Sequence, residues 1–270
     1  MEMCFLLIIS SFKNIFYKLK LILKTPIYIY SLIGVFVLLF TSTFYYEPNR
    51  NEIMTGFAFY NLLKGEINLE SSDICNILLN SGNGYYSMFS QVIAALPFLI
   101  FYVSEKNTHF NIFQLTREKT CRYIIESYIT CAISVFITIM IAMLVYDAVF
   151  IIAFRCVEFN LSELFIHNML SAFSNVLSSM IQLVIVGFVY NVFSTVGLFF
   201  TINYYIYVAS QKEIMADGNE WIMCLPDNML SYFERLPLLK DKVLILVCIK
   251  VIVIIILEVF NNYRRRIIRY

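Results

Sequence analysis

Long apolar stretches separated by short polar segments form the main pattern along this chain. A membrane-spanning helix needs roughly 20 mostly apolar residues, because each residue adds about 1.5 Å and the hydrocarbon core is about 30 Å thick. The pattern therefore predicts an all-α membrane protein with six transmembrane helices, arranged as a single domain over residues 1–270. The six expected spans are residues 27–44, 86–103, 123–154, 169–190, 192–209 and 243–260.

Four of these spans have features that a simple apolar stretch would lack. The stretch 169–209 is apolar throughout and too long for one crossing, so the polar Asn191, followed by Ser194, is expected to divide it into two helices joined by a tight turn. The third span is longer than a bilayer requires and should tilt or project from the membrane. Pro97 predicts a kink in the second span.

Residues 4–24 have a two-sided pattern that differs from the spans. At 100° per residue, the apolar side chains and the lysines of this segment fall on different faces of a helix, although Leu21 interrupts the polar face. We expect a helix lying in the cytoplasmic interface with its lysines near anionic head groups; the alternative is a simple extension of the first span. A cleaved signal peptide is not expected, because the apolar run 4–9 is short and no basic residue precedes it. The expected apolar face comprises Phe5, Ile8, Ile9, Phe12, Ile15, Phe16, Leu19 and Leu23, and the polar face Lys13, Tyr17, Lys20 and Lys24.

Composition excludes several classes of protein. Hydrophobic residues make up 60% of the chain and charged residues 14%, whereas soluble domains carry roughly 25% charged residues. A soluble enzyme would lack a polar surface with this composition, and disordered chains are far less apolar. The net charge of +1 gives no indication of a nucleic-acid partner.

The distribution of charge predicts an orientation. Residues 1–26, 104–122 and 261–270 contain twelve Lys and Arg against three Glu, a net charge of +9. Residues 45–85, 155–168 and 210–242 contain seven basic and thirteen acidic residues, a net charge of −6. Because positive segments stay in the cytoplasm, both termini and the 104–122 loop are expected inside. The 45–85 and 210–242 loops are expected outside, and an even number of spans agrees with this orientation.

Motifs for catalysis or metal binding are not recognisable in the sequence. There is no Walker A, HExxH or GxSxG motif, and the seven cysteines show no metal-ligand spacing with the two histidines. Cys75 and Cys224 could form an outer disulfide, but free thiols are favoured. His109 and His167 are expected to be solvated in loops on opposite sides of the membrane. We therefore expect no catalytic site, metal or cofactor in this chain.

A few charged residues fall within the expected spans, where charge is costly and often functional. Asp147 and Lys250 both lie seven residues inside the outer ends of their spans, at similar depth. They are expected either to pair or to face a common polar cavity; the favoured alternative is that Lys250 extends to the interface and Asp147 lies in an external extension of its helix. Glu126 is expected at the cytoplasmic start of its helix, and Glu258 beside the 264–266 arginine cluster.

The 104–122 loop is the most informative stretch. Aromatic and aliphatic residues alternate with polar ones there, and basic residues follow, which suits a short helix on the membrane surface that docks into a cytoplasmic partner. The apolar positions are Phe110, Phe113 and Leu115, and the basic ones Arg117, Lys119 and Arg122.

The whole chain resembles the ABC-2 type permeases, the membrane subunits of a class of ATP-driven exporters, including those of the peptide-export and bacteriocin-immunity kind. These permeases have an interfacial helix before the first span, six spans, and a large outer loop after the first span. The specific resemblance lies in the 104–122 loop, where the family has an acidic residue, a coupling helix, a Leu-Thr-Arg-like stretch and a further Arg. The matching positions here are Glu105, Leu115, Thr116, Arg117 and Arg122-Tyr123.

Two positions of this loop depart from the family pattern. Family members often have Gly early in the loop, where this chain has Thr108 or Phe110. They often have Lys at the start of the third span, where this chain has Glu126-Ser127. These departures leave the geometry of ATPase coupling open.

The outer loop at residues 210–242 also fits this resemblance. It contains many apolar residues, including Trp221, Met223 and Phe233. So large an apolar surface is rarely exposed to water. Either short re-entrant helices dip into the outer leaflet, as the family has, or the loop forms a small amphipathic cap.

The resemblance implies the permease subunit of an exporter in a bacterial cell membrane. A separate cytoplasmic ABC ATPase dimer would bind ATP and Mg²⁺, and a second permease subunit, identical or not, would complete the pathway. The aromatic, weakly charged spans suit an amphiphilic cargo such as a hydrophobic or antimicrobial peptide or a lipid. The alternatives are a non-transporting immunity or sensor protein that binds a toxin or lipid and, less favoured, a secondary transporter.

Overall fold

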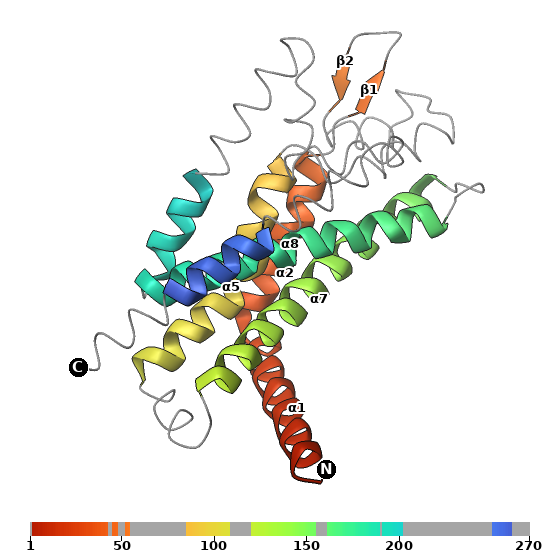
Figure 1. The fold of residues 1–270 in the computed structure, drawn as a ribbon. Helices are drawn as coiled ribbons and strands as arrows, with labels where there is room; N and C mark the ends of the chain where they lie inside the picture. The colour runs from red at the N-terminus through yellow and green to blue at the C-terminus, as the bar shows by residue number, and fades with distance from the viewer. Residues whose placement is uncertain are drawn as a thin grey trace.

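The computed structural model describes residues 2–42, 45–47, 52–54, 85–108, 120–154, 161–189, 191–201 and 250–260, and these are almost entirely helical (Figure 1). The long helices are α1 (Glu2–Leu23), α2 (Pro26–Ser42), α5 (Tyr85–Asn107), α7 (Thr120–Phe154) and α8 (Leu161–Val189). A shorter helix, Val192–Thr201, and a helical segment at 250–260 complete the helical part. Strands β1 (Tyr45–Glu47) and β2 (Glu52–Met54) form a small antiparallel ribbon with Tyr46 opposite Ile53.

Within the described residues, three helical stretches are long and apolar enough to cross a membrane: Phe89–Asn107, Arg122–Ala153 and Leu164–Val189. A fourth is present if the bent pair Ser11–Leu23 and Pro26–Thr41 counts as one span. By length and composition, these helices indicate an integral membrane protein. The expected spans 192–209 and 243–260 are described only over 192–201 and 250–260, so the count of six remains a prediction.

The chain bends by 72° between α1 and α2. Thr25 ends the first helix, because its hydroxyl donates to the carbonyl of Ile22 at 2.7 Å. Pro26 then starts α2. Proline suits this position, because the N–H of the first helical residue has no hydrogen-bond partner within the helix and proline has no N–H. Its ring also disfavours a helical conformation for Thr25, which separates α1 from α2. The bend lets α1 project from one end of the bundle (Figure 1), as an interfacial helix would.

Helix α1 divides its apolar residues between two directions. Ile15, Leu19 and Ile22 are buried against the bundle, whereas Phe12 and Phe16 are exposed. Part of the expected apolar face is therefore buried against the bundle and part of it is exposed. The buried side of the helix also includes Lys18.

Close contacts join α2 to α5 and α7. The hydroxyl of Ser31 donates to the carbonyl of Ile93 at 2.6 Å, and a Cβ at Gly34 would lie 3.1 Å from the side chain of Ile93. Further along α2, the ring of Phe40 lies 5.0 Å from that of Tyr146 on α7, measured between centroids. Glycine at position 34 thus permits an approach of two helices that a larger residue would hinder.

Helices α7 and α8 run beside one another over much of their length (Figure 1). Helix α8 ends at Val189 and the next helix begins at Val192, so the chain breaks where the polar Asn191 interrupts the apolar stretch. The Asn191 side-chain oxygen accepts a hydrogen bond from the backbone N–H of Ser194 at 3.3 Å. An N-cap of this kind satisfies a donor that the first helical turn leaves free.

Two helices extend further than the hydrophobic pattern predicts. Helix α5 continues to Asn107, so Glu105 lies in its last turn and not in a loop. Helix α8 begins at Leu161, well before the expected start at residue 169. Backbone hydrogen bonding within a helix does not depend on apolar side chains, so a helix can continue into polar sequence beyond the hydrocarbon core.

Candidate functional site

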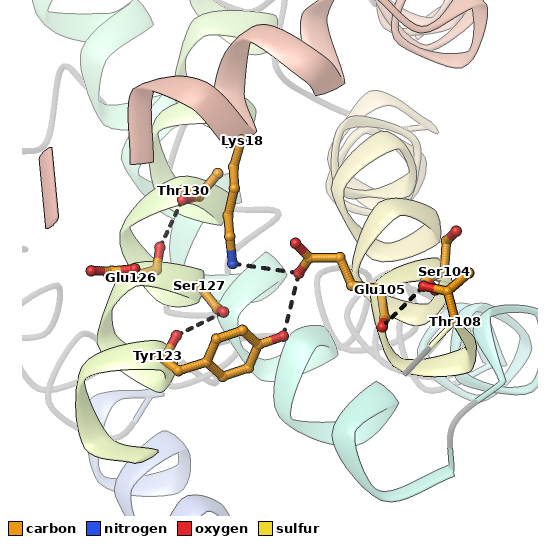
Figure 2. A network of polar contacts seen from close by, with 8 residues as sticks. All are labelled: Lys18, Ser104, Glu105, Thr108, Tyr123, Glu126, Ser127 and Thr130. Atoms are coloured by element: carbon orange, nitrogen blue, oxygen red, sulfur yellow. Dashed lines mark hydrogen bonds and ion pairs between the residues drawn. The ribbon is translucent and has the colours of Figure 1, made fainter. Parts of the chain in front are cut away.

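A buried polar cluster joins α1, α5 and α7 at one end of the bundle (Figure 2). The ammonium of Lys18 lies 3.4 Å from Oε2 of Glu105, and the hydroxyl of Tyr123 donates to the same oxygen at 3.3 Å. The Lys18 ammonium also lies 4.5 Å from the centre of the Tyr123 ring. Only 3% of Lys18 and 7% of Glu105 are exposed. We call Lys18, Glu105 and Tyr123 the basal cluster.

Local structure places the members of the basal cluster on three elements. Glu105 lies in the last turn of α5, which Thr108 closes by donating from its hydroxyl to the carbonyl of Ser104 at 2.8 Å. Tyr123 lies in the first turn of α7, and Ser127 one turn later donates to the Tyr123 carbonyl at 2.9 Å. The cluster therefore spans both ends of the segment 109–119, the centre of the expected coupling loop.

The electrostatics of the basal cluster favour a fixed arrangement. Removing charges from water costs several kcal/mol per ion, and a buried pair offsets that cost only with good geometry and further hydrogen bonds. Here the Glu105 carboxylate has a cation and a phenol hydroxyl as partners, and the cation also lies over an aromatic ring. Moving α1 or α5 alone would leave a buried charge without its partner, and moving α7 alone would remove the phenol hydrogen bond and the ring from that pair.

A second ion pair lies beside the basal cluster on α7. The Arg122 guanidinium Nε donates to Oε1 of Glu126 at 3.0 Å, one helical turn apart, and Glu126 is buried. Helix α7 begins at Thr120, so Glu126 lies in its second turn rather than at its start. The expected role of Glu126 at the helix terminus is therefore replaced by a pairing with Arg122.

Most of the coupling residues expected from the sequence lie outside the described residues. Glu105 and Arg122 are described and belong to neighbouring but separate ion pairs. The following residues fall outside the described ranges: Phe110, Phe113, Leu115, Thr116, Arg117, Trp221, Met223, Phe233, Cys75, Cys224, His109 and Arg264–Arg266.

Asp147 and Lys250, for which pairing was one of the arrangements expected, have separate partners. Oδ2 of Asp147 accepts a hydrogen bond from Nδ2 of Asn168 on α8 at 2.6 Å, and its Oδ1 has no hydrogen-bond partner. The amine of Lys250 donates to the hydroxyl of Ser178 at 3.0 Å. Asp147 does not lie in an exposed extension either, because only 4% of it is exposed. Packing of α7 against α8 buries it, which the sequence of α7 alone does not indicate.

His167 also differs from expectation. It was expected in a solvated outer loop, but it lies in α8 and is 0% exposed. The reason is the early start of α8, which turns residues 161–168 into helix and directs His167 into the bundle.

His167 belongs to a buried polar face along α8 that the sequence analysis missed. The signal is present in the sequence, because the polar residues recur every three or four positions, as one face of a helix requires. At 1.5 Å per residue the face extends over about 22 Å. Its members are His167, Asn168, Ser171, Asn175, Ser178, Ser179 and Gln182, all buried, and we call it the α8 polar face.

The α8 polar face bonds chiefly to α5. The hydroxyls of Tyr86 and Ser171 lie 3.2 Å apart, within hydrogen-bonding distance. Ser90 donates to Oδ1 of Asn175 at 2.8 Å. Polar side chains inside a membrane protein hydrogen-bond across helices in this way, because no water is present to satisfy them. These bonds fix how α5 and α8 face each other.

Glu258 forms a further contact between distant segments. Its Oε2 accepts a hydrogen bond from the hydroxyl of Tyr128 at 3.1 Å, which joins the segment 250–260 to α7. The arginines that were expected beside Glu258 lie outside the described residues.

The side chains of these clusters form ion pairs and hydrogen bonds that hold helices in position. Among the residues that the structure describes, no group of three or more His, Cys, Asp or Glu could hold a metal ion. Both the basal cluster and the α8 polar face join helices that are far apart in the sequence.

Comparison with protein families, curated proteins and solved structures finds no match to this chain.

Proposed function

We propose that this chain is the transmembrane permease subunit of an ATP-driven exporter, with a separate cytoplasmic ABC ATPase that supplies the energy. The observation that carries the proposal is the basal cluster. It joins both ends of the 109–119 segment to α1, and this segment is the part of the chain that the sequence analysis assigns to ATPase docking.

The position of the basal cluster suits the transmission of force. An ATPase that grips 109–119 would pull on the last turn of α5 and the first turn of α7. Because Lys18, Glu105 and Tyr123 share one hydrogen-bonded ion pair, a pull on either end would also move α1. The three helices would then move together and not independently.

Helix α7 offers a route from the basal cluster across the membrane. It continues from Thr120 to Phe154 and packs along α8. Closure and opening of an ATPase dimer would rock this pair of helices between two states, and cargo would be moved by its different affinities for those states. Six spans with both termini in the cytoplasm of a bacterial cell membrane, and pairing with a second permease subunit, belong to this proposal.

The cargo class follows from the character of the helices. The spans are aromatic and weakly charged, which suits an amphiphilic cargo such as a hydrophobic peptide or a lipid. The chain would carry no catalytic residues, and ATP and Mg²⁺ would bind to the partner ATPase.

Co-purification tests the proposal directly. The tagged protein is isolated in mild detergent from the membranes of its own cells, and ATP hydrolysis in the purified fraction is measured. We expect an ATPase subunit to be recovered with the wild-type protein. We expect Phe113→Ala and Arg117→Ala to reduce its recovery without changing the amount of permease, because both lie in the docking segment.

Arg269→Ala serves as the matched control, because it removes a cytoplasmic arginine outside the docking segment. If no ATPase is recovered, and the two loop variants behave like the control, the exporter proposal is wrong and a non-transporting immunity or sensor protein becomes the better interpretation.

A further inference from the structure

The carboxyl group of Asp147 has an unusual environment within the bundle. It lies on α7, six residues before the end of the span at Ala153, and is 4% exposed. Oδ2 accepts the 2.6 Å hydrogen bond from Nδ2 of Asn168, which is 1% exposed. The remaining oxygen of each group, Oδ1 of Asp147 and Oδ1 of Asn168, is buried and has no hydrogen-bond partner.

The charged groups of α1, α2 and α5 do not neutralise Asp147. Helix α5 contributes Tyr86, whose hydroxyl lies beside Ser171 of α8. Helix α2 has no charged residue, and its tyrosines lie ten or more positions from Phe40, which contacts Tyr146 beside Asp147. Lys18 of α1 pairs with Glu105 at the other end of the bundle.

Among the side chains that the structure describes, α8 and the 250–260 segment contribute the remaining groups of this environment. Helix α8 contributes Asn168 itself and the buried His167 next to it in sequence. Lys250 contacts Ser178, which is ten residues or roughly 15 Å along α8 from Asn168. Glu258 contacts Tyr128, nineteen residues before Asp147 on α7.

An ionised carboxylate is costly in this position. A buried charge without a cation and with a single hydrogen bond is strongly disfavoured, and such a group takes up a proton instead. The amide oxygen of Asn168 is an acceptor without a donor, and a carboxylic acid is both a donor and an acceptor. One proton on Oδ1 of Asp147 would therefore satisfy two buried oxygens at once.

We propose that Asp147 and Asn168 form a proton-binding site in the membrane domain. The proton resides on Oδ1 of Asp147 and is donated to Oδ1 of Asn168, while Nδ2 of Asn168 donates to Oδ2 of Asp147. The result is a neutral acid–amide pair with two hydrogen bonds across the α7–α8 contact. This site is independent of the proposed exporter function, since it needs no ATPase and no cargo.

The site makes the α7–α8 contact sensitive to pH. Where the carboxyl group of an unfolded chain would already be ionised, the folded chain holds one proton more. Stability therefore falls as the pH rises, because folding requires the folded chain to take up that proton. Loss of the proton would place an unpaired charge between two helices and weaken their contact.

Infrared spectroscopy of the wild-type protein tests the site without any variant. The chain has five aspartates, at 73, 147, 217, 227 and 241, and all except Asp147 are expected in the outer loops. The protein is produced with aspartate labelled with ¹³C at the side-chain carboxyl and reconstituted in lipid nanodiscs. We expect a ¹³C-shifted carbonyl band of a protonated carboxylic acid at pH 7, and we expect Asp147→Asn to abolish it.

Thermal unfolding gives a second, separate measure. An asparagine at 147 can donate to and accept from Asn168 as the neutral acid does. Asp147→Asn should therefore match the wild-type melting temperature near about pH 4, where the aspartate of the unfolded chain is also protonated. It should exceed the wild-type value at pH 7, because the wild type loses stability as the pH rises and the variant does not. Asp147→Leu should lower the melting temperature near about pH 4, because it removes both hydrogen bonds to Asn168 where the wild type needs no extra proton to fold. Absence of the band at pH 7, its persistence in Asp147→Asn, or stabilisation by Na⁺ over choline at equal ionic strength would each overturn the proposal, the last by indicating a metal cation on an ionised carboxylate.

Discussion

Lys18 shows how a residue can have a different role from the one its sequence neighbours suggest. It lies on a helix whose two other lysines, Lys13 and Lys20, are exposed, and its ammonium is nevertheless buried beside Glu105, 87 residues away in the sequence. The long, flexible side chain allows the charge to reach a partner while its methylene groups pack against apolar neighbours. At the scale of single residues, the packing of the helices decides which charges are buried.

The buried pair predicts a stability effect. Lys18→Met should destabilise the protein by about 3–5 kcal/mol, because it leaves the Glu105 carboxylate buried without its cation. The measurement is the thermal unfolding midpoint in detergent. Lys20→Met is the matched control, since Lys20 lies on the exposed side of the same helix.

A double variant separates the ion pair from simple loss of packing. Glu105→Gln added to Lys18→Met should recover part of the lost stability, because no charge then remains to be compensated. Equal unfolding midpoints for Lys18→Met and Lys20→Met would show that the pair contributes nothing.

At the scale of elements, the α8 polar face decides how the helices face one another. Apolar side chains pack in many ways inside a membrane, because lipid is as apolar as the helix surface. Hydrogen bonds restrict the choice: Ser90 meets Asn175, and the Nε2 of Gln182 donates to the carbonyl of Gln91 at 3.0 Å. The face therefore specifies one rotation of α8 relative to α5.

Substitution within the α8 polar face tests this role. Asn175→Leu removes the acceptor for Ser90 and should destabilise the protein by about 1 kcal/mol, the usual range for an interhelical hydrogen bond in a membrane. Thermal unfolding is the measurement, and Phe173→Leu is the control, because Phe173 is exposed on the same helix. If Asn175→Leu leaves the unfolding midpoint at the control value, the hydrogen bond does not hold the two helices.

At the scale of the whole molecule, the two buried polar sites lie toward opposite ends of α7. Tyr123 belongs to the basal cluster and Asp147 to the proton site, 24 residues or roughly 36 Å apart along the helix. The charge distribution in the sequence predicts that the basal cluster lies on the cytoplasmic side and Asp147 near the outer face. One continuous helix thus connects a charged contact near one of its ends with a carboxyl group toward the other.

Cysteine labelling tests this orientation. In a background with the seven native cysteines replaced, Lys64→Cys should react with a membrane-impermeant maleimide in intact cells, because the 45–85 loop is expected outside. Lys24→Cys should react only after the membrane is permeabilised. Equal labelling of both positions in intact cells, or the reverse order, would contradict the orientation.

The sequence by itself determined the membrane character of this protein, the approximate ranges of its long helices and the break at Asn191. Those features depend on the length of apolar segments and on local capping, both of which are properties of neighbouring residues. Glu105 and Arg122 were expected to act together in the 104–122 loop. Their separate ion pairs could not be read from their spacing.

Only the tertiary structure decided which polar groups are buried and what they contact. The Lys18–Glu105 pair, the burial of His167 and the bond between Asp147 and Asn168 each join or cover residues on different helices. Such contacts depend on the rotation and offset of one helix against another. A helical pattern shows that polar residues share a face but not what that face meets, and for Asp147 the neighbouring helix supplied an amide in place of the expected lysine.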